Sequence, residues 1–281
     1  MNDQMAILTD VTKCIGCEEC VHACKSTYAL PADRPWRWQK DVTDLSATRW
    51  TTIINKPGGV HVRKQCRHCA EPACASVCPV GALTKTPEGA VVYDGAKCMG
   101  CRYCMMACPY GIPRYTWLEP IPYVRKCVMC HEKIQKGELE QPACTKACPT
   151  DATIYGPRVE LLAEARKRIA AEPKKYIDRI WGEKEVGGTN VLYIAGIDLG
   201  FLGWTPDLGN ESLPAKTWPA LRAVPAVFVG VGVAMSAASW VIGRRMKIAA
   251  AQAAAAPAES AEAPAIDEPT QEEPKGEADS K

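Results

Sequence analysis

The chain has very little phenylalanine and few aromatic residues of any kind: two Phe among 281 residues, with Phe, Trp and Tyr together making up 7%. A core packed in the usual way with large aromatic side chains is therefore not expected, and something other than side chains should fill part of the interior. The chain also lacks a large excess of charge of either sign, because 34 basic and 32 acidic residues leave a net charge of +2. The sequence thus gives no indication of a nucleic-acid-binding surface.

The N-terminal stretch MNDQMAILTDVTKC lacks the parts of an export signal. It has no basic region, no apolar run and no twin-arginine pair, and Cys14 comes too early for a cleavable peptide to precede it. A nucleotide-binding loop is also missing. Gly187-Gly188-Thr189 does not stand between a strand and a helix with the GxxxxGK pattern, so we interpret it as a turn.

Cysteine, by contrast, is abundant, and sixteen residues fall into four quartets with none left over. In chain order the quartets are Cys14, Cys17, Cys20 and Cys24; Cys66, Cys69, Cys74 and Cys78; Cys98, Cys101, Cys104 and Cys108; and Cys127, Cys130, Cys144 and Cys148. Disulfides would suit an exported chain, but no export signal supports them. Structural zinc prefers two separated CxxC pairs, which such dense runs do not offer.

Iron–sulfur clusters account for the spacing best. Three thiolates on one tight loop hold three irons of a cubane, while the fourth cysteine of the run is donated to a neighbouring cluster and is followed by proline. That proline follows Cys78, Cys108 and Cys148, whereas Lys25 follows Cys24. We expect the proline to end the short helix that carries the donated cysteine. Sixteen thiolates predict four [4Fe–4S] clusters in two ferredoxin-like units, but spacing alone does not settle which quartets pair.

Three phrases carry a family resemblance: QCRHCAEPACASVCPVGAL, KCMGCRYCMMACPYGIPRY and KCVMCHEKIQKGELEQPACTKACPTDA. They resemble the iron–sulfur electron-transfer subunits of the molybdopterin oxidoreductase family, and the resemblance covers roughly residues 5–155. That family includes the beta subunits of membrane-bound formate dehydrogenase, dimethyl sulfoxide reductase and polysulfide reductase, and the partner subunits of some membrane-bound hydrogenases. A membrane-anchored beta subunit without its own export signal is most similar to that of formate dehydrogenase.

The resemblance implies a nested pairing of the quartets, second with third and first with fourth. It assigns all sixteen cysteines as iron ligands in four sets: Cys14, Cys17, Cys20 and Cys148; Cys24, Cys127, Cys130 and Cys144; Cys66, Cys69, Cys74 and Cys108; and Cys78, Cys98, Cys101 and Cys104. Some nitrate reductase relatives carry tryptophan at the position of Cys101 and hold a [3Fe–4S] cluster there. The cysteine in this chain implies a full cubane.

Short strands and one surface helix are predicted around the cysteines. TTIIN and VHVRK alternate on either side of Pro57-Gly58-Gly59, and residues 84–94 are typical of a second hairpin. VLYI, residues 191–194, predicts a further strand. After residue 157, apolar residues at helical spacing predict a helix packed on the cluster domain: Val159, Leu162, Ala165 and Ile169. Three tryptophans, Trp36, Trp38 and Trp50, have two interpretations. They either pack this small domain, or they shield a cluster or meet a partner subunit.

One apolar run is long enough to cross a membrane. Residues 223–243 contain no charge over 21 positions, and as a helix they span about 31 Å. Trp218 and Trp240 lie near its ends, where interfacial aromatic residues are favoured. Basic residues number three just after the run and two before it, which weakly places the C-terminus in the cytoplasm and the clusters on the periplasmic face. A signal-bearing partner would then carry the folded domain across the membrane.

These observations predict an α+β fold with two nested ferredoxin-like units of two clusters each, and a C-terminal single transmembrane helix. The predicted domains are a double ferredoxin-like domain over residues 1–155, a helix and strand extension with a linker over 156–217, the transmembrane helix over 218–246, and a disordered acidic tail over 247–281.

The sequence offers no site for substrate chemistry. Its histidines are scattered, and we interpret them as packing or hydrogen-bonding residues: His22, His61, His68 and His131. We therefore predict a non-catalytic electron-transfer subunit at the inner membrane. Its partners would be a molybdopterin catalytic subunit, of the formate dehydrogenase type, and a membrane haem b or quinone-reactive subunit. Alternatives are the iron–sulfur subunit of a nickel–iron hydrogenase or another molybdopterin oxidoreductase, and a redox-sensing membrane protein.

Overall fold

The computed structural model of the protein describes residues 4–33, 44–117, 119 and 122–255. Two compact parts make up the chain, Met1–Arg222 and Ala223–Lys281, and each is described by itself. Trp36 and Trp38 lie outside the described residues, as does most of the predicted acidic tail, from residue 256 onward.

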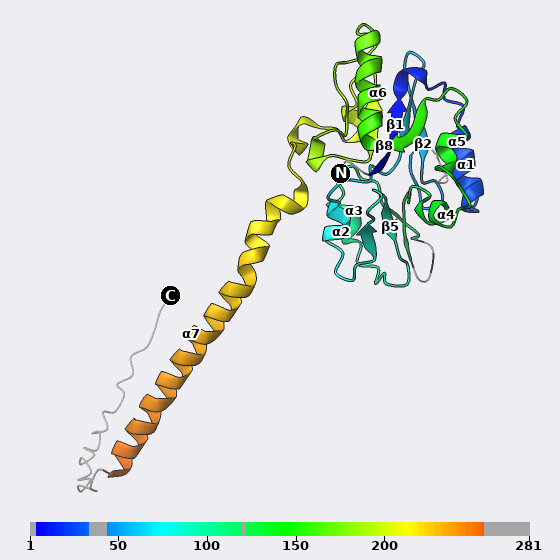
Figure 1. Cartoon of the computed structure of the whole chain (residues 1–281). Helices are drawn as coiled ribbons and strands as arrows, with labels where there is room; N and C mark the ends of the chain where they lie inside the picture. Colours follow the sequence, from blue (N-terminus) through cyan, green and yellow to red (C-terminus); the bar gives the residue numbers. More distant parts are fainter. Residues whose placement is uncertain (1–3, 34–43, 118, 120–121, 256–281) are drawn as a thin grey trace, which may run out of the picture. The chain divides into compact units, whose positions relative to one another are not determined.

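The main sheet of the first part has three strands in the order β8–β1–β9. The central strand, β1 (Met5–Asp10), runs antiparallel to β8 (Thr153–Pro157) and parallel to β9 (Val191–Ile194) (Figure 1). All four residues of β9 are buried, which confirms the strand predicted from VLYI. Because β1 precedes the first cysteine loop and β8 follows the last, the sheet brings the two ends of the cysteine-containing region together.

Helix α6 (Arg158–Ala171) packs beside β1 and β8 (Figure 1). Its buried apolar side chains meet those of β1 in one cluster that contains Leu161, Leu162, Ala165, Ile169, Ala6 and Leu8. Val159, which the spacing places on this face, is instead 49% exposed. Arg158, the residue before it, is buried on this face instead, and its guanidinium donates to the carbonyl of Thr189 at 3.0 Å.

The other side of the sheet faces an aromatic core, which the low aromatic content did not lead us to expect. Trp181 and Trp204 are buried, and the ring of Trp204 lies 4.8 Å from that of Tyr110 and 6.3 Å from that of Tyr193, measured between centroids. The expectation of a core without large aromatic residues was wrong, because a few tryptophans in one place suffice. These residues come largely from the segment after α6, which therefore forms part of the core.

Three small antiparallel hairpins connect the cysteine loops. β2 (Thr52–Lys56) pairs with β3 (Val60–Lys64), and β4 (Leu83–Lys85) pairs with β5 (Val91–Tyr93). Both hairpins lie where the turn residues predicted them. A third, β6 (Arg114–Tyr115) with β7 (Val124–Arg125), occupies the gap before the last cysteine quartet.

The cysteines sit on or beside five short helices: α1 (Glu19–Thr27), α2 (Ala73–Ser76), α3 (Tyr103–Ala107), α4 (His131–Gln135) and α5 (Ala143–Lys146). Helices α2, α3 and α5 end one or two residues before the cysteine that precedes a proline. Cys108, for example, is extended, with φ −78° and ψ 112°. A residue before proline is sterically driven out of the helical region, so the cysteine itself is already outside the helix. Cys24 has no such proline and lies within α1.

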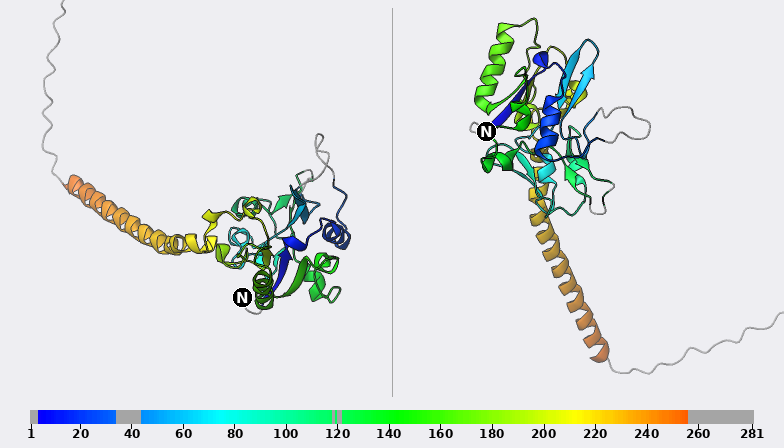
Figure 2. Two further views of the ribbon diagram at one scale, coloured as in Figure 1. Left: turned by 90° about the horizontal axis from the view of Figure 1, so that it is seen from above. Right: turned by 90° about the vertical axis from the view of Figure 1, so that its right-hand side faces the viewer.

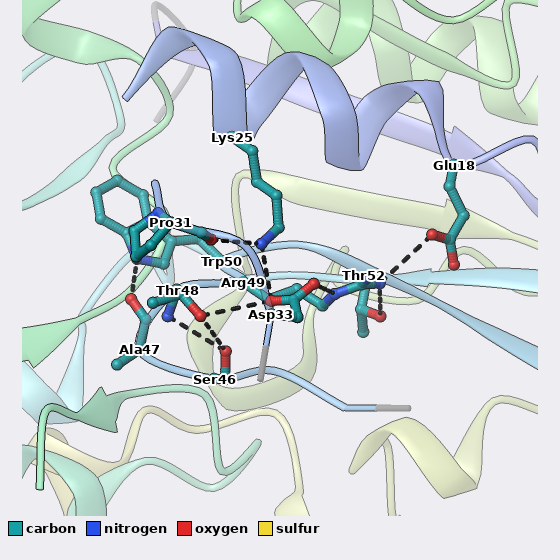
Figure 3. A network of polar contacts seen from close by, with 10 residues as sticks. All are labelled: Glu18, Lys25, Pro31, Asp33, Ser46, Ala47, Thr48, Arg49, Trp50 and Thr52. Atoms are coloured by element: carbon teal, nitrogen blue, oxygen red, sulfur yellow. Dashed lines mark hydrogen bonds and ion pairs between the residues drawn. The ribbon is translucent and has the colours of Figure 1, made fainter. Parts of the chain in front are cut away.

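Lys25, which stands where the other quartets have proline, continues α1 and anchors it. Its ammonium group lies 2.8 Å from a carboxylate oxygen of Asp33 and donates to the carbonyl of Pro31 at 3.0 Å (Figure 3). Asp33 also pairs with Arg49 at 2.7 Å, and Arg49 lies 3.6 Å from Glu18 at the other end of α1. Arg49 therefore ties both ends of this helix to the segment that leads into β2.

Trp50 packs against the same helix end. Its ring centroid lies 4.8 Å from that of Tyr28, and its indole nitrogen donates to the carbonyl of Ala47 at 2.9 Å. These contacts agree with the interpretation of Trp50 as a packing residue of this small domain.

Helix α7 (Leu213–Ala255) runs from the end of the first part through the second. Figure 2 shows it from two directions as one continuous helix. Within the part of the chain that the structure describes, it is the one helix long and apolar enough to cross a membrane. It extends beyond the predicted span, and residues 247–255, which we assigned to the tail, are helical because KIAAAQAAA is rich in strong helix formers.

Candidate iron–sulfur sites

The first set of thiols comes from the two ends of the cysteine-containing region. Cys14, Cys17, Cys20 and Cys148 line one cavity, together with Arg63. Helix α1, which carries Cys20, packs on α5, which precedes Cys148 (Figure 1). This contact, with the antiparallel pairing of β1 and β8, brings residues more than a hundred positions apart to one site.

The second set lies on the inner side of α1. Burial raises the pKa of Cys24 well above its usual value, and the nearby thiols of Cys127, Cys144 and Cys130 raise it further. Such mutual influence requires the four sulfur atoms to lie close to one another. Cys24, Cys127, Cys130 and Cys144 are all buried here, and they are the four thiols that the sequence assigned to the second set.

The third set packs against the aromatic core, with Cys66 buried and Cys69, Cys74 and Cys108 partly buried. Burial raises the pKa of Cys69, and the thiols of Cys66, Cys108 and Cys74 act in the same direction. Cys66, Cys69 and Cys108 belong to the same cluster of packed side chains as Tyr110 and Trp204. A thiol site surrounded by apolar side chains is thus formed by two loops that are more than thirty residues apart.

The fourth set opens to the surface again. Cys78, Cys98, Cys101 and Cys104 line a second cavity, whose wall also includes Val80, Met99 and the exposed Arg102. The Cys78 sulfur accepts the backbone N–H of Ala82 at 3.2 Å. Burial acts to raise the pKa of Cys78, but a row of backbone N–H groups, from Val80 to Leu83, lowers it overall. Such donors stabilise negative charge on sulfur.

The four sets form a series. Cys144 of the second set lies close enough to Cys20 of the first to raise the pKa of Cys20, and the two pack in one cluster. In the same way Cys66 of the third set raises the pKa of Cys127 of the second, and Cys104 of the fourth raises that of Cys74 of the third. The structure brings together the members of every set named from the sequence. That these thiols bind iron stays a prediction.

All four loops use the same backbone turn. The residue before the second cysteine of each CxxC is left-handed: Gly16 (φ 74°), His68 (φ 49°), Gly100 (φ 76°) and Met129 (φ 57°). The turn reverses the chain between the two cysteines and so directs both thiols to one side. Thr189 of the Gly187-Gly188-Thr189 turn forms a β-bridge with Cys69, which supports the third set from the segment after α6.

The histidines near the sets make structural contacts. His68 accepts the backbone N–H of Val91 through Nδ1 at 2.8 Å, and His61 shares a hydrogen bond with Asn55 at 2.7 Å. His131 Nδ1 lies 3.9 Å from a carboxylate oxygen of Glu88, and His22 is exposed.

The burial of the basic residues beside the thiols was not predicted from the sequence. Arg63, Arg67 and Lys126 are each at most 3% exposed. Strand alternation would place Val62 and Arg63 on opposite faces with one of them in solvent, but β3 is buried on both faces at this point. The sequence signal that could have pointed to these residues was the number of basic residues within and next to the cysteine loops.

Known proteins show the same cysteine pattern. Residues 59–158 match the 4Fe-4S dicluster domain. A protein of Nitratidesulfovibrio vulgaris strain Hildenborough is 41% identical over 265 residues, which cover 90% of this chain and 70% of that one. The hydrogenase-2 operon protein HybA of Escherichia coli O157:H7 is 38% identical over 233 residues, covering 69% of this chain and 70% of HybA.

The iron–sulfur subunit of nitrate-inducible formate dehydrogenase from Escherichia coli K12 is 32% identical over 214 residues, covering 68% of each chain. The chain belongs to the family of iron–sulfur subunits of molybdopterin oxidoreductases. As a member of this family it is an electron-transfer subunit of a multi-subunit oxidoreductase, with a ferredoxin-type domain for [4Fe–4S] clusters.

The residues of this family member fit such clusters. Each site offers four soft sulfur donors and no harder ligand among them, which is the ligand type of a [4Fe–4S] cluster. Burial, followed by neighbouring thiols, raises the pKa of Cys104 to about 11. Burial likewise raises the pKa of Cys20 to about 11, although Arg63 acts in the opposite direction. Thiols so placed would ionise with difficulty alone, and a cationic metal group would supply the charge that lets them do so. Within the described ranges, no three His, Cys, Asp or Glu side chains converge tightly enough for a single metal ion.

Proposed function

We propose that the chain relays electrons through four [4Fe–4S] clusters between a catalytic subunit and a membrane subunit. The four thiol sets would each hold one cluster, as two nested ferredoxin-like units. The observation that carries this proposal is the series of sets, in which both outer sets line cavities, the second set is buried and the third packs against the aromatic core. An electron entering at one outer set would have a continuous route to the other.

Each cluster would exchange one electron at a time with little rearrangement of its ligands. The work of the protein is to hold the thiols and exclude water. The left-handed turns position the sulfur atoms, backbone N–H groups such as that of Ala82 stabilise their negative charge, and the aromatic core covers part of the third set. We propose no substrate chemistry for this chain.

We propose that the chain is anchored by α7 at the inner membrane, as a single span. The domains would be residues 1–155 for the clusters, 156–217 for the extension and 218–246 for the span, with the tail following the end of α7 at Ala255. The excess of basic residues after the span favours a cytoplasmic C-terminus and a periplasmic cluster domain. The membrane partner would be a haem b or quinone-reactive subunit.

The catalytic partner we propose is a molybdenum or tungsten formate dehydrogenase subunit. The similarity to the formate dehydrogenase iron–sulfur subunit supports it. A nickel–iron hydrogenase partner is the second candidate, and the 38% identity to HybA of the hydrogenase-2 operon favours it.

Purification of the complex from membranes tests the proposal. Four clusters predict about sixteen iron and sixteen acid-labile sulfide per chain, and EPR spectra of the reduced protein with interacting S = 1/2 signals. Co-purified molybdenum or tungsten would identify the formate dehydrogenase type, and co-purified nickel the hydrogenase type. Zinc, half of the expected iron, or a chain that purifies alone with electron-transfer activity intact would contradict the relay.

A further inference from the structure

Arg63 is an arginine held inside the protein without an acidic partner among the described residues. It is 2% exposed, on β3. Its guanidinium donates to the hydroxyl of Thr51 at 3.0 Å, to the hydroxyl of Thr153 at 2.8 Å, and to the side-chain oxygen of Gln65. These partners are all neutral, so they satisfy the hydrogen bonds of the guanidinium but leave its charge uncompensated.

Arg63 lies beside the thiol sites. It lines the cavity of the first set with Cys14 and Cys20. Cys20 packs in one cluster with Cys144 of the second set, so Arg63 lies where the first and second sets meet. Burial acts to lower the pKa of Arg63, but the nearby Cys144 and Cys20, followed by Tyr193 and Cys127, raise it overall. The three hydroxyl and amide partners fix the guanidinium in this place.

A [4Fe–4S] cluster with four thiolates carries net negative charge, and reduction adds one electron to it. A fixed positive charge nearby therefore stabilises the reduced form more than the oxidised form and raises the reduction potential. An arginine stays protonated at every working pH, so its charge is constant. The effect is strong in a buried site because little water screens the charge.

We propose that Arg63 is the shared counter-charge of the first and second clusters and sets their reduction potentials. The inference rests on the proposed function, since it requires clusters at these two sets. Arg63 acts on the clusters through its charge, because it lies beside the cysteine ligands and does not itself bind iron. The fourth set has no equivalent: the basic residue that lines its cavity, Arg102, is exposed and lies over the rings of Tyr115 and Trp117.

The test is a potentiometric titration followed by EPR on the complex purified from membranes. Arg63→Gln removes the charge and should shift the reduction equilibrium of two clusters roughly tenfold toward the oxidised form, which is about 59 mV for one electron. Arg63→Lys keeps the charge and should restore most of the potential. Arg166→Gln is the matched control, because Arg166 is an exposed arginine paired with Glu183, and it should shift nothing.

Gln65→Glu provides a second test if Arg63→Gln does not assemble. The new carboxylate would lie against the guanidinium, neutralise it and lower the same two potentials while Arg63 stays in place. Unchanged potentials in Arg63→Gln with full iron content, or in Gln65→Glu, would overturn the inference, as would equal shifts for Arg63→Lys and Arg63→Gln. A wild-type complex with fewer than four clusters would instead overturn the proposed function.

Discussion

Single residues in the cysteine loops are selected by close approach as much as by backbone conformation. Four loops place a left-handed residue before the second cysteine, but only two use glycine there. A Cβ added to Gly16 would lie 2.6 Å from the ring of His61, and one added to Gly100 would lie 2.7 Å from the Tyr115 hydroxyl. His68 and Met129 adopt the same conformation without glycine, at the modest cost of a left-handed L-residue. Glycine is therefore required where a neighbouring ring closes on the loop.

If the proposed ligand sets hold, Cys101 is the residue at which the cluster type can be changed. It lines the cavity of the fourth set, and its replacement by tryptophan would remove one of the four thiols. We expect Cys101→Trp to give a [3Fe–4S] signal in the EPR spectrum of the oxidised protein, with iron content reduced by about one per chain, because a cubane iron without a thiolate is lost readily.

The matched control for that change is Met99→Trp. Met99 lines the same cavity but is 65% exposed and carries no thiol, so the bulk of tryptophan is added without removing a ligand. A [3Fe–4S] signal from both variants, or from neither, would show that Cys101 is not an iron ligand.

Short elements were predictable where local chemistry determines them. Pro57-Gly58-Gly59 marks the turn of β2 and β3, and the paired strands appear on both sides of it. The parallel pairing of β1 with β9 joins residues about 185 positions apart and leaves no local signal. The burial of Arg63 also depends on tertiary packing, since the face of β3 that should meet solvent is covered. The thiol sets themselves came from a family resemblance, because spacing left their pairing open.

Helix α1 differs from α2, α3 and α5 because it continues past the fourth cysteine of its quartet, Cys24, whereas they end before theirs. Lys25→Pro would give this quartet the proline of the other three, but it would also remove a backbone donor inside α1 and the ion pair with Asp33. We expect the free energy of unfolding to fall by about 3 kcal/mol or more. The first and second clusters should then lose iron on mild heating, which is measured as a loss of visible absorbance.

Lys25→Ala separates the two causes. It keeps the helix and removes the side-chain contacts with Asp33 and with the carbonyl of Pro31, while Arg49 stays paired with Asp33. The expected cost is about 1 kcal/mol or less. Equal cluster loss in both variants would mean that the ion pair, and not the helix, holds Cys24 in place.

At the scale of the whole molecule, the chain separates a packed part that carries every cysteine from a long helix with exposed side chains. The first part ends at Arg222 and contains all four thiol sets and both of the packed cores. Helix α7 has no buried residue and exposes apolar side chains such as Val229, Phe228 and Trp240. So much exposed apolar surface on one helix is expected only where lipid or another protein covers it.

Truncation after Arg222 tests whether the apolar helix holds the chain in the membrane while the first part holds the clusters. When the chain is produced without partner subunits, the full-length protein should stay in membranes through an alkaline carbonate wash and require detergent for release. The truncated chain should appear in the soluble fraction with the iron content of the full-length protein, because the apolar run is gone while the thiol sets and their supporting core are intact. If the truncated chain resists the wash as well, the first part itself holds the membrane. If it loses its iron, α7 contributes to the stability of the cluster domain beyond anchoring.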